Sequence, residues 1–186
     1  ARGRTMVTLI DQRQGTRFTG WVVPDGRYVA GLGDWYRKNS LVVGGFIVLE
    51  QVEGTDEVVI DYRPRRRRRE WVRLMRVVDG HPVLETSKVE IGCEYDELMV
   101  VSDADPLATD ALRQQLAEQG ISVSELIEML MPEITKLSSQ GTAHAKTLYS
   151  VCNMVRRVPP APIFAALALS PSFEPVGNGY WRMVGR

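Results

Sequence analysis

The hydrophobic pattern of this 186-residue chain changes its period near residue 101, and no other feature constrains the fold as strongly. From Thr5 to about Val101, the apolar residues come in short runs rich in valine, isoleucine, tryptophan and tyrosine, separated by turns that contain glycine. This pattern is typical of β-strands. After Val101 the apolar residues recur at the 3.6-residue spacing of helices. The chain therefore predicts an α+β protein, with a β-barrel-like domain over 1–101 and a helical domain over 102–186.

Two Asp-Gly pairs lie between strand-like runs of the first domain. Asp25-Gly26 and Asp79-Gly80 supply the positive φ that a type I′ turn requires, so we expect a tight hairpin at each. A short helix over 33–39, with Asp34 as a candidate cap and Asn39 as its stop, interrupts the strands. The predicted strands span 5–10, 18–23, 27–30, 45–52, 57–62, 70–78, 81–86 and 98–101.

The second domain is predicted to contain helices followed by a hairpin. Ser122 or Ser124 caps the second helix, and Pro132 is expected to end it. The hairpin turns at Gly177-Asn178-Gly179. The predicted helices span 107–119, 122–131, 143–157 and 162–169, and the strands of the hairpin span 173–176 and 180–183. Three helices followed by a two-stranded hairpin is the order of a winged helix-turn-helix domain.

The C-terminal third resembles winged-helix domains of the family that includes the HARE-HTH modules of bacterial and chromatin-associated proteins. The resemblance implies a supporting helix over 124–131, a recognition helix over 143–157 and a wing around Asn178. The segment Pro159-Pro160-Ala161-Pro162 departs from the family, in which the third helix usually continues directly into the wing. The resemblance rests on Ser122-Val123-Ser124-Glu125-Leu126, on Thr147-Leu148-Tyr149-Ser150, and on Phe173-Glu174-Pro175-Val176-Gly177-Asn178-Gly179-Tyr180-Trp181.

A shorter stretch of the first domain resembles the DNA-binding pseudobarrels of plant B3 transcription factors and of some restriction-enzyme effector domains. The resemblance implies DNA contact through the open face of the barrel. Gly45 stands where the family usually has an aspartate. We interpret Trp35 and Tyr36 as core aromatics rather than as surfaces for base stacking. The matching residues are Gly31-Leu32-Gly33-Asp34-Trp35-Tyr36, Asn39-Ser40-Leu41 and Gly44-Gly45-Phe46-Ile47-Val48-Leu49.

A run of arginines, Arg63 with Arg65–Arg69, lies between two predicted strands and is followed by Trp71. Like charges this close repel one another, and a phosphate backbone is a common partner that offsets the repulsion. The net charge of the chain is zero, but the charge is segregated, with +1 over 1–101, −5 over 102–140 and +4 over 141–186. Both observations favour a nucleic-acid partner. The alternative is a ridge that the chain's own carboxylates neutralise.

These features of the sequence therefore predict a DNA-binding protein, or a DNA-binding region of a larger protein, that contacts duplex DNA. Arginines would bind phosphates, and side chains of the third helix would read base edges. The predicted phosphate ligands are Arg63, Arg65, Arg66, Arg67, Arg68, Arg69, Arg156, Arg157 and Arg182, and the predicted readout residues are His144, Lys146, Thr147 and Asn153.

Other classes of function receive less support. Motifs of hydrolases and nucleotide-binding loops do not occur, so we expect no enzyme within this segment and no cofactor. Asp56, Glu57 and Asp61 invite comparison with metal-binding nuclease carboxylates, but no lysine lies at a nuclease-like spacing, and we expect these carboxylates to balance the nearby arginine run. Two cysteines without a metal-binding spacing, and no run of about 20 apolar residues, favour a cytoplasmic protein without metal or membrane.

Two alternatives remain open. The chain could be a protein-interaction module of a larger assembly whose arginine run docks on an acidic partner. The first residues lie within a charged stretch, which favours a segment of a longer protein. The barrel could also recognise structured RNA. Salt dependence distinguishes the first alternative from DNA binding, and competition with duplex RNA distinguishes the second.

Overall fold

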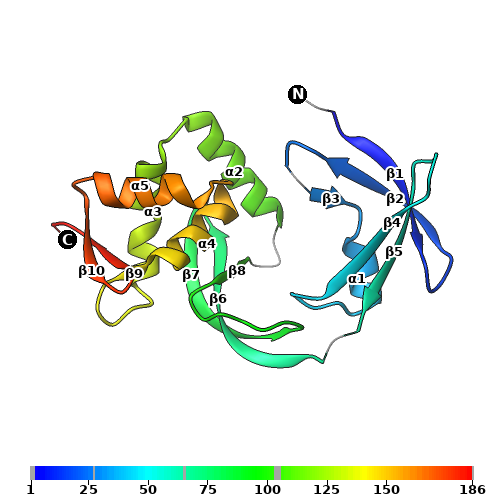
Figure 1. Ribbon diagram of the computed structural model, residues 1–186, viewed down its shortest axis with the longest axis horizontal. Helices are drawn as coiled ribbons and strands as arrows, with labels where there is room; N and C mark the ends of the chain where they lie inside the picture. The colour runs from blue at the N-terminus through cyan, green and yellow to red at the C-terminus, as the bar shows by residue number, and fades with distance from the viewer. Residues whose placement is uncertain (1–2, 27, 65, 103–105, 186) are drawn as a thin grey trace. The chain divides into compact units, whose positions relative to one another are not determined.

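The computed structural model describes residues 3–26, 28–64, 66–102 and 106–185, which form five helices and eleven strands (Figure 1). They group into two compact units. Unit 1 contains Ala1–Glu70 and Glu90–Glu94, and unit 2 contains Trp71–Val89 and Tyr95–Arg186. This division differs from the predicted boundary at residue 101. The segments 71–89 and 95–101 pack with the C-terminal helices because Met75, Leu84 and Val100 belong to the same buried core as those helices.

Unit 1 is built on a curled five-stranded sheet with the strand order β3-β2-β1-β5-β4 (Figure 1). Strands β1 and β5 are parallel, with Leu9 opposite Val58, and the other neighbours are antiparallel. The elements are β1 (Thr5–Asp11), β2 (Arg17–Val23), β3 (Tyr28–Ala30), α1 (Gly33–Lys38), β4 (Phe46–Gln51) and β5 (Glu57–Arg63).

The core of unit 1 is small and lies between the sheet and α1. Leu9, Leu32, Trp35 and Ile60 are its buried members. The Trp35 indole N–H donates to Asp11 Oδ2 at 2.9 Å, and this aspartate is only 2% exposed. The core role predicted for Trp35 is confirmed, whereas its neighbour Tyr36 keeps 38% of its surface exposed.

The two predicted Asp-Gly turns differ in the structure. Asp79 and Gly80 have φ values of 51° and 76°, and they join β6 (Arg68–Val78) to β7 (His81–Ile91) as a two-residue turn. The tight turn predicted at Asp25-Gly26 is wrong. Val23 pairs with Tyr28, and neither Asp25 nor Gly26 has the positive φ that a type I′ turn requires.

Unit 2 places two small sheets around a set of helices. One sheet has the order β7-β6-β8, with β8 (Val100–Ser102) parallel to β6, and the other has the order β10-β11-β9. The helices share one core, in which α4 packs against α2, α3 and α5. The remaining elements are α2 (Pro106–Gln119), α3 (Val123–Thr135), β9 (Ala143–His144), α4 (Ala145–Val155), α5 (Pro160–Leu169), β10 (Phe173–Gly177) and β11 (Tyr180–Met183).

Local capping decides where α3 begins, whereas tertiary packing decides where it ends. Ser122 and Glu125 form a capping box, as the sequence predicted for Ser122. The prediction that Pro132 ends this helix is wrong, since the helix continues to Thr135. Ile134, which is 3% exposed, joins the core in the added turn. Its burial offsets the one backbone hydrogen bond that a proline cannot donate.

The third predicted helix is shorter than expected. Ala143 pairs with Trp181 of β11, so the first residues predicted to be helical form a strand, and α4 begins only at Ala145. Arg156 and Arg157 follow the end of the helix. Among the described residues, no helix is both long enough and apolar enough to cross a membrane.

Candidate nucleic-acid interface

The arginine run joins β5 to β6, and the structure describes all of its residues except the one at position 65. Two of its guanidinium groups are anchored to the backbone of unit 1. Arg67 Nη2 donates to the carbonyl of Ser40 at 2.7 Å, and Arg68 Nη2 donates to the carbonyl of Cys93 at 2.9 Å. These bonds fix the positions of the two guanidinium groups, and about half of each side chain stays exposed.

Two carboxylates face the arginine run. Glu90 lies 3.9 Å from Arg67 and 3.7 Å from Arg69, and Glu70 lies 3.4 Å from Arg68. Exposed pairs of this kind contribute about 0–1 kcal/mol each. In the part of the chain that the structure describes, Arg63 and Arg66 make no ion pair. The chain's own carboxylates therefore neutralise the run only in part.

A cleft of about 710 Å³ opens beside these arginines in unit 1. Arg66, Arg67 and Arg68 line it together with Gly92, Cys93 and Glu94. A second hollow of about 210 Å³, lined partly by Arg63, shares Arg67 and Gly92 with the cleft. Guanidinium groups at fixed positions around a hollow match the geometry of phosphate oxygens, which accept paired N–H bonds.

Two of the three carboxylates expected to balance the arginine run, Glu57 and Asp61, pair with other arginines. Glu57 pairs with Arg17, and Asp61 accepts from Arg13 Nε at 2.6 Å. The hydrogen bond from Arg13 lowers the pKa of Asp61 below its ordinary value. In the described residues, histidine, cysteine and acidic side chains do not form a group of three that could hold a metal ion.

Two of the predicted readout residues have structural roles at the start of α4. His144 caps the helix, with its Nδ1 accepting from the backbone N–H of Lys146 at 3.0 Å. The side chain of Lys146 is paired with Asp96 at 2.6 Å, and this bond lowers the pKa of Asp96. Lys146 remains about half exposed, so it can still exchange this carboxylate for a phosphate.

The side chains of the other two predicted readout residues form hydrogen bonds within unit 2. Thr147 is fully buried, and its hydroxyl donates to the Leu98 carbonyl at 2.7 Å. The side-chain amide of Asn153 donates to the carbonyls of Tyr149 and Val158 and accepts from the Val158 N–H, which closes the turn after α4. In this structure neither residue can reach a base edge, because α4 is a core helix packed on several sides.

The C-terminal arginines are exposed and come from two places in unit 2. Arg156 donates to the carbonyl of Ile121, and the Arg157 side chain makes no hydrogen bond or ion pair within the described residues. Arg182 on β11 pairs with Glu174 on the neighbouring strand. All three guanidinium groups lie at the surface and stay candidates for phosphate contact.

Two exposed surfaces were not predicted from the sequence. In unit 1, Trp21 and Tyr28 lie on neighbouring strands and are 41% and 40% exposed, with Arg4 beside them around a hollow of about 140 Å³. In the predicted pairing of these two strands, Trp21 and Tyr28 lie on the same face, and this could have indicated the exposed aromatic surface. In unit 2, Phe164 and Leu169 of α5 are 51% and 82% exposed. Helix α5 is apolar on all sides, and this pattern in the sequence could have indicated its exposed apolar surface.

Comparison with protein-family models, with curated proteins and with solved structures finds no match to this chain.

Proposed function

We propose that this chain is a DNA-binding protein, or the DNA-binding region of a longer protein, and that it grips duplex phosphates through the arginine cleft of unit 1. The carrying observation is the cleft of about 710 Å³ lined by Arg66, Arg67 and Arg68. Two of these guanidinium groups are positioned by backbone carbonyls, and Arg66 has no partner among the described residues. A preorganised cationic hollow gives affinity for a polyanion at low cost in side-chain entropy.

The curled sheet of unit 1 supports the proposal that this unit is a pseudobarrel of the B3-like kind. Its short helix α1 follows β3, and the helix packs Trp35 against the sheet. The residues 39–45 that follow α1 include Ser40, to which Arg67 is bonded. The loop that resembles the family is therefore in direct contact with the arginine run, as a shared DNA-facing surface requires.

The order α3, β9, α4, α5, β10 and β11 supports the proposal that unit 2 contains a winged helix-turn-helix. In this arrangement α5, which follows the turn after α4, takes the recognition position. Helix α5 carries no charged residue, and its exposed side chains include Phe164 and Leu169. We therefore assign to unit 2 phosphate contacts by Arg156, Arg157 and Arg182, and no base readout by α5.

The test is fluorescence-anisotropy binding to a mixed-sequence duplex of about 20 base pairs across a salt series. The variant Arg63→Gln/Arg66→Gln removes two arginines that have no ion pair in the described residues. Each lost phosphate contact should reduce the slope of log affinity against log salt by about 0.9. The expected reduction is therefore about 1.8 units.

The matched control is Arg37→Gln/Arg76→Gln, which removes the same charge from two ion-paired residues that do not line the cleft. We expect its slope to stay near that of the wild type. An equal loss in both variants would mean that net charge and not the cleft drives binding. Absence of duplex binding at low salt would refute the proposal, and displacement by duplex RNA as effective as by DNA would redirect it to RNA.

A second function, docking on an acidic protein partner, is favoured by one observation on unit 2. The apolar side chains of Phe164 and Leu169 are exposed on a segment, 134–173, that contains no aspartate or glutamate but four lysines and arginines. Exposed apolar residues on a segment of positive net charge fit a protein that presents apolar and acidic side chains. Poly-glutamate tests this: if it binds as tightly as duplex DNA at equal salt, the acidic-partner function is preferred.

A further inference from the structure

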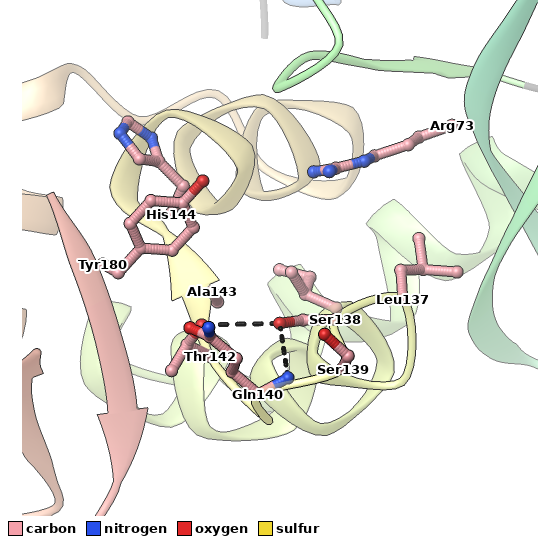
Figure 2. Close-up of a pocket in the computed structure, with 10 residues that line it drawn as sticks. Arg73, Leu137, Ser138, Ser139, Gln140, Thr142, Ala143, His144 and Tyr180 are labelled. Atoms are coloured by element: carbon pink, nitrogen blue, oxygen red, sulfur yellow. Dashed lines mark hydrogen bonds between the residues drawn. The ribbon is translucent and has the colours of Figure 1, made fainter. Parts of the chain in front are cut away.

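We propose that unit 2 contains a separate ligand site, a pocket that binds the phosphate group of a small phosphomonoester. The pocket has a volume of about 330 Å³, which is within the range of small-molecule sites, and Arg73 of β6 lies on one side of it. The loop after α3 and the residues of β9 and β11 complete it (Figure 2). The site goes beyond the proposed DNA contact, because the arginine cleft belongs to unit 1 and every lining residue of this pocket belongs to unit 2.

Arg73 is the charged group of the pocket, and it lacks an acidic partner. Its Nη1 donates to Thr147 Oγ1 at 3.1 Å, which holds the guanidinium in place, and it makes no ion pair within the described residues. The side chain is half-buried, and in Figure 2 its guanidinium points into the pocket. A half-buried cation without a counter-ion is costly, so an anion that enters the pocket would be stabilised more than at the open surface.

The remaining polar lining consists of neutral donors. The loop residues Ser138, Ser139 and Gln140 lie opposite the Arg73 side chain together with Thr142 (Figure 2). Ser138 Oγ accepts from the Gln140 N–H at 3.3 Å and lies 3.4 Å from Thr142 Oγ1, so the loop shape is held from within. Within the described part of the chain, the hydroxyl of Ser139 and the side-chain amide of Gln140 make no hydrogen bond. They are available to a ligand.

None of the described residues that line the pocket carries a carboxylate, and this favours an anionic ligand. The 134–173 segment, which supplies most of the pocket, has no acidic residue. His144 and Tyr180 form the far wall, and their ring centroids lie 4.9 Å apart in an edge-to-face arrangement. Helix α4 begins directly after His144. The N-terminus of a helix carries partial positive charge. One arginine, several hydroxyl and amide donors, and a ring-bearing wall fit a phosphate attached to a small organic group.

The experiment is isothermal titration of the full chain with inorganic phosphate and with phenyl phosphate. NMR shifts of the Ser139 and Gln140 amides locate the site. We expect phenyl phosphate to bind more tightly than inorganic phosphate, because its ring can contact the Tyr180 wall. Arg73→Gln should weaken binding at least about tenfold, since it removes charged hydrogen bonds to the ligand.

Two further variants keep the test decisive if Arg73→Gln perturbs the contact with Thr147. Ser139→Asp places a negative charge at an exposed pocket position whose side chain makes no hydrogen bond to the described residues, so it should weaken binding at least about tenfold while the fold is unchanged. Arg76→Gln, on the same strand but outside the lining, should leave binding unchanged.

Three results would overturn the proposal. The first is no amide shift at Ser139 and Gln140 with either probe at millimolar concentration. The second is equal weakening by Arg76→Gln, which would indicate a general charge effect. The third is displacement of phenyl phosphate by a short DNA duplex, which would assign the pocket to a nucleic-acid surface. Failure of duplex binding in the cleft would leave this pocket's titration unaffected, so the two proposals fail independently.

Discussion

Replacement of Asp11 by alanine should destabilise unit 1 selectively. This aspartate is 2% exposed and accepts three hydrogen bonds. Its Oδ2 accepts from the Trp35 indole at 2.9 Å, and its Oδ1 accepts from the backbone N–H groups of Arg13 at 2.8 Å and Gln14 at 3.1 Å. One side chain therefore joins the β1–β2 turn to the core tryptophan of α1.

The magnitude follows from what each donor can do after the change. The Trp35 indole N–H is buried and would be left without an acceptor, which costs about 1–3 kcal/mol. The two turn N–H groups are only partly buried and can bond to water, so each contributes about 0.5–1 kcal/mol. Together these contributions predict a loss of about 2–5 kcal/mol from the free energy of unfolding of unit 1.

The assay is urea unfolding followed by the four indole N–H signals in NMR spectra. Trp21 and Trp35 report on unit 1, and Trp71 and Trp181 report on unit 2. In the variant, the unit 1 signals should disappear at lower urea while those of unit 2 keep their midpoint. The matched control, Asp25→Ala, changes an exposed aspartate of a neighbouring loop and should leave both midpoints unchanged. A loss below about 1 kcal/mol, or an equal shift of both units, would refute the reasoning.

Three other predictions concern single groups. Burial raises the pKa of the Cys152 thiol to about 12, so a thiol reagent at neutral pH should label Cys93 in the folded protein and Cys152 only after unfolding; simultaneous labelling would contradict this. The hydrogen bond from Arg13 lowers the pKa of Asp61 below 3.8, so its stabilising effect is complete above that pH and is lost as the pH falls through the lowered pKa. Acid unfolding of Asp61→Asn should show a weaker pH dependence there, and an unchanged profile would oppose the assignment. Ser122→Ala removes the cap of α3 and should cost about 1 kcal/mol in urea unfolding of unit 2, with no change in unit 1.

Local signals predicted much of the secondary structure. Strand alternation located β1, β2 and β5 to within one residue at each end, and α2 ends at Gln119, as predicted, before Gly120 with φ of 62°. Ser122 and the Asp79-Gly80 turn also behave as their local chemistry requires. Each of these features is decided by a few neighbouring residues, through a side-chain cap or an allowed φ.

The candidate site was only partly predictable. The arginine run stands out by composition alone, but which carboxylates approach it depends on strand pairing. Glu90 is more than 20 residues away from Arg67 along the chain and still faces it, whereas Asp61, far closer in sequence, pairs with Arg13. The internal hydrogen bonds of Thr147 and Asn153 could not be predicted for the same reason, because helical spacing does not reveal which faces of a helix other elements cover.

The sequence by itself determined the order of strands and helices, the β-rich first part and the helical second part, and the clustering of arginines. Tertiary structure decided the parallel pairing of β1 with β5, the assignment of 71–89 and 95–101 to the C-terminal core, and the burial of α4. It also brought Arg73 beside the loop over 138–142, about 65 residues later in the chain. The physical reason is the range of the interactions. Capping, turn geometry and alternation act over a few residues, whereas burial of apolar surface joins any segments that can close together, and its outcome depends on the whole chain.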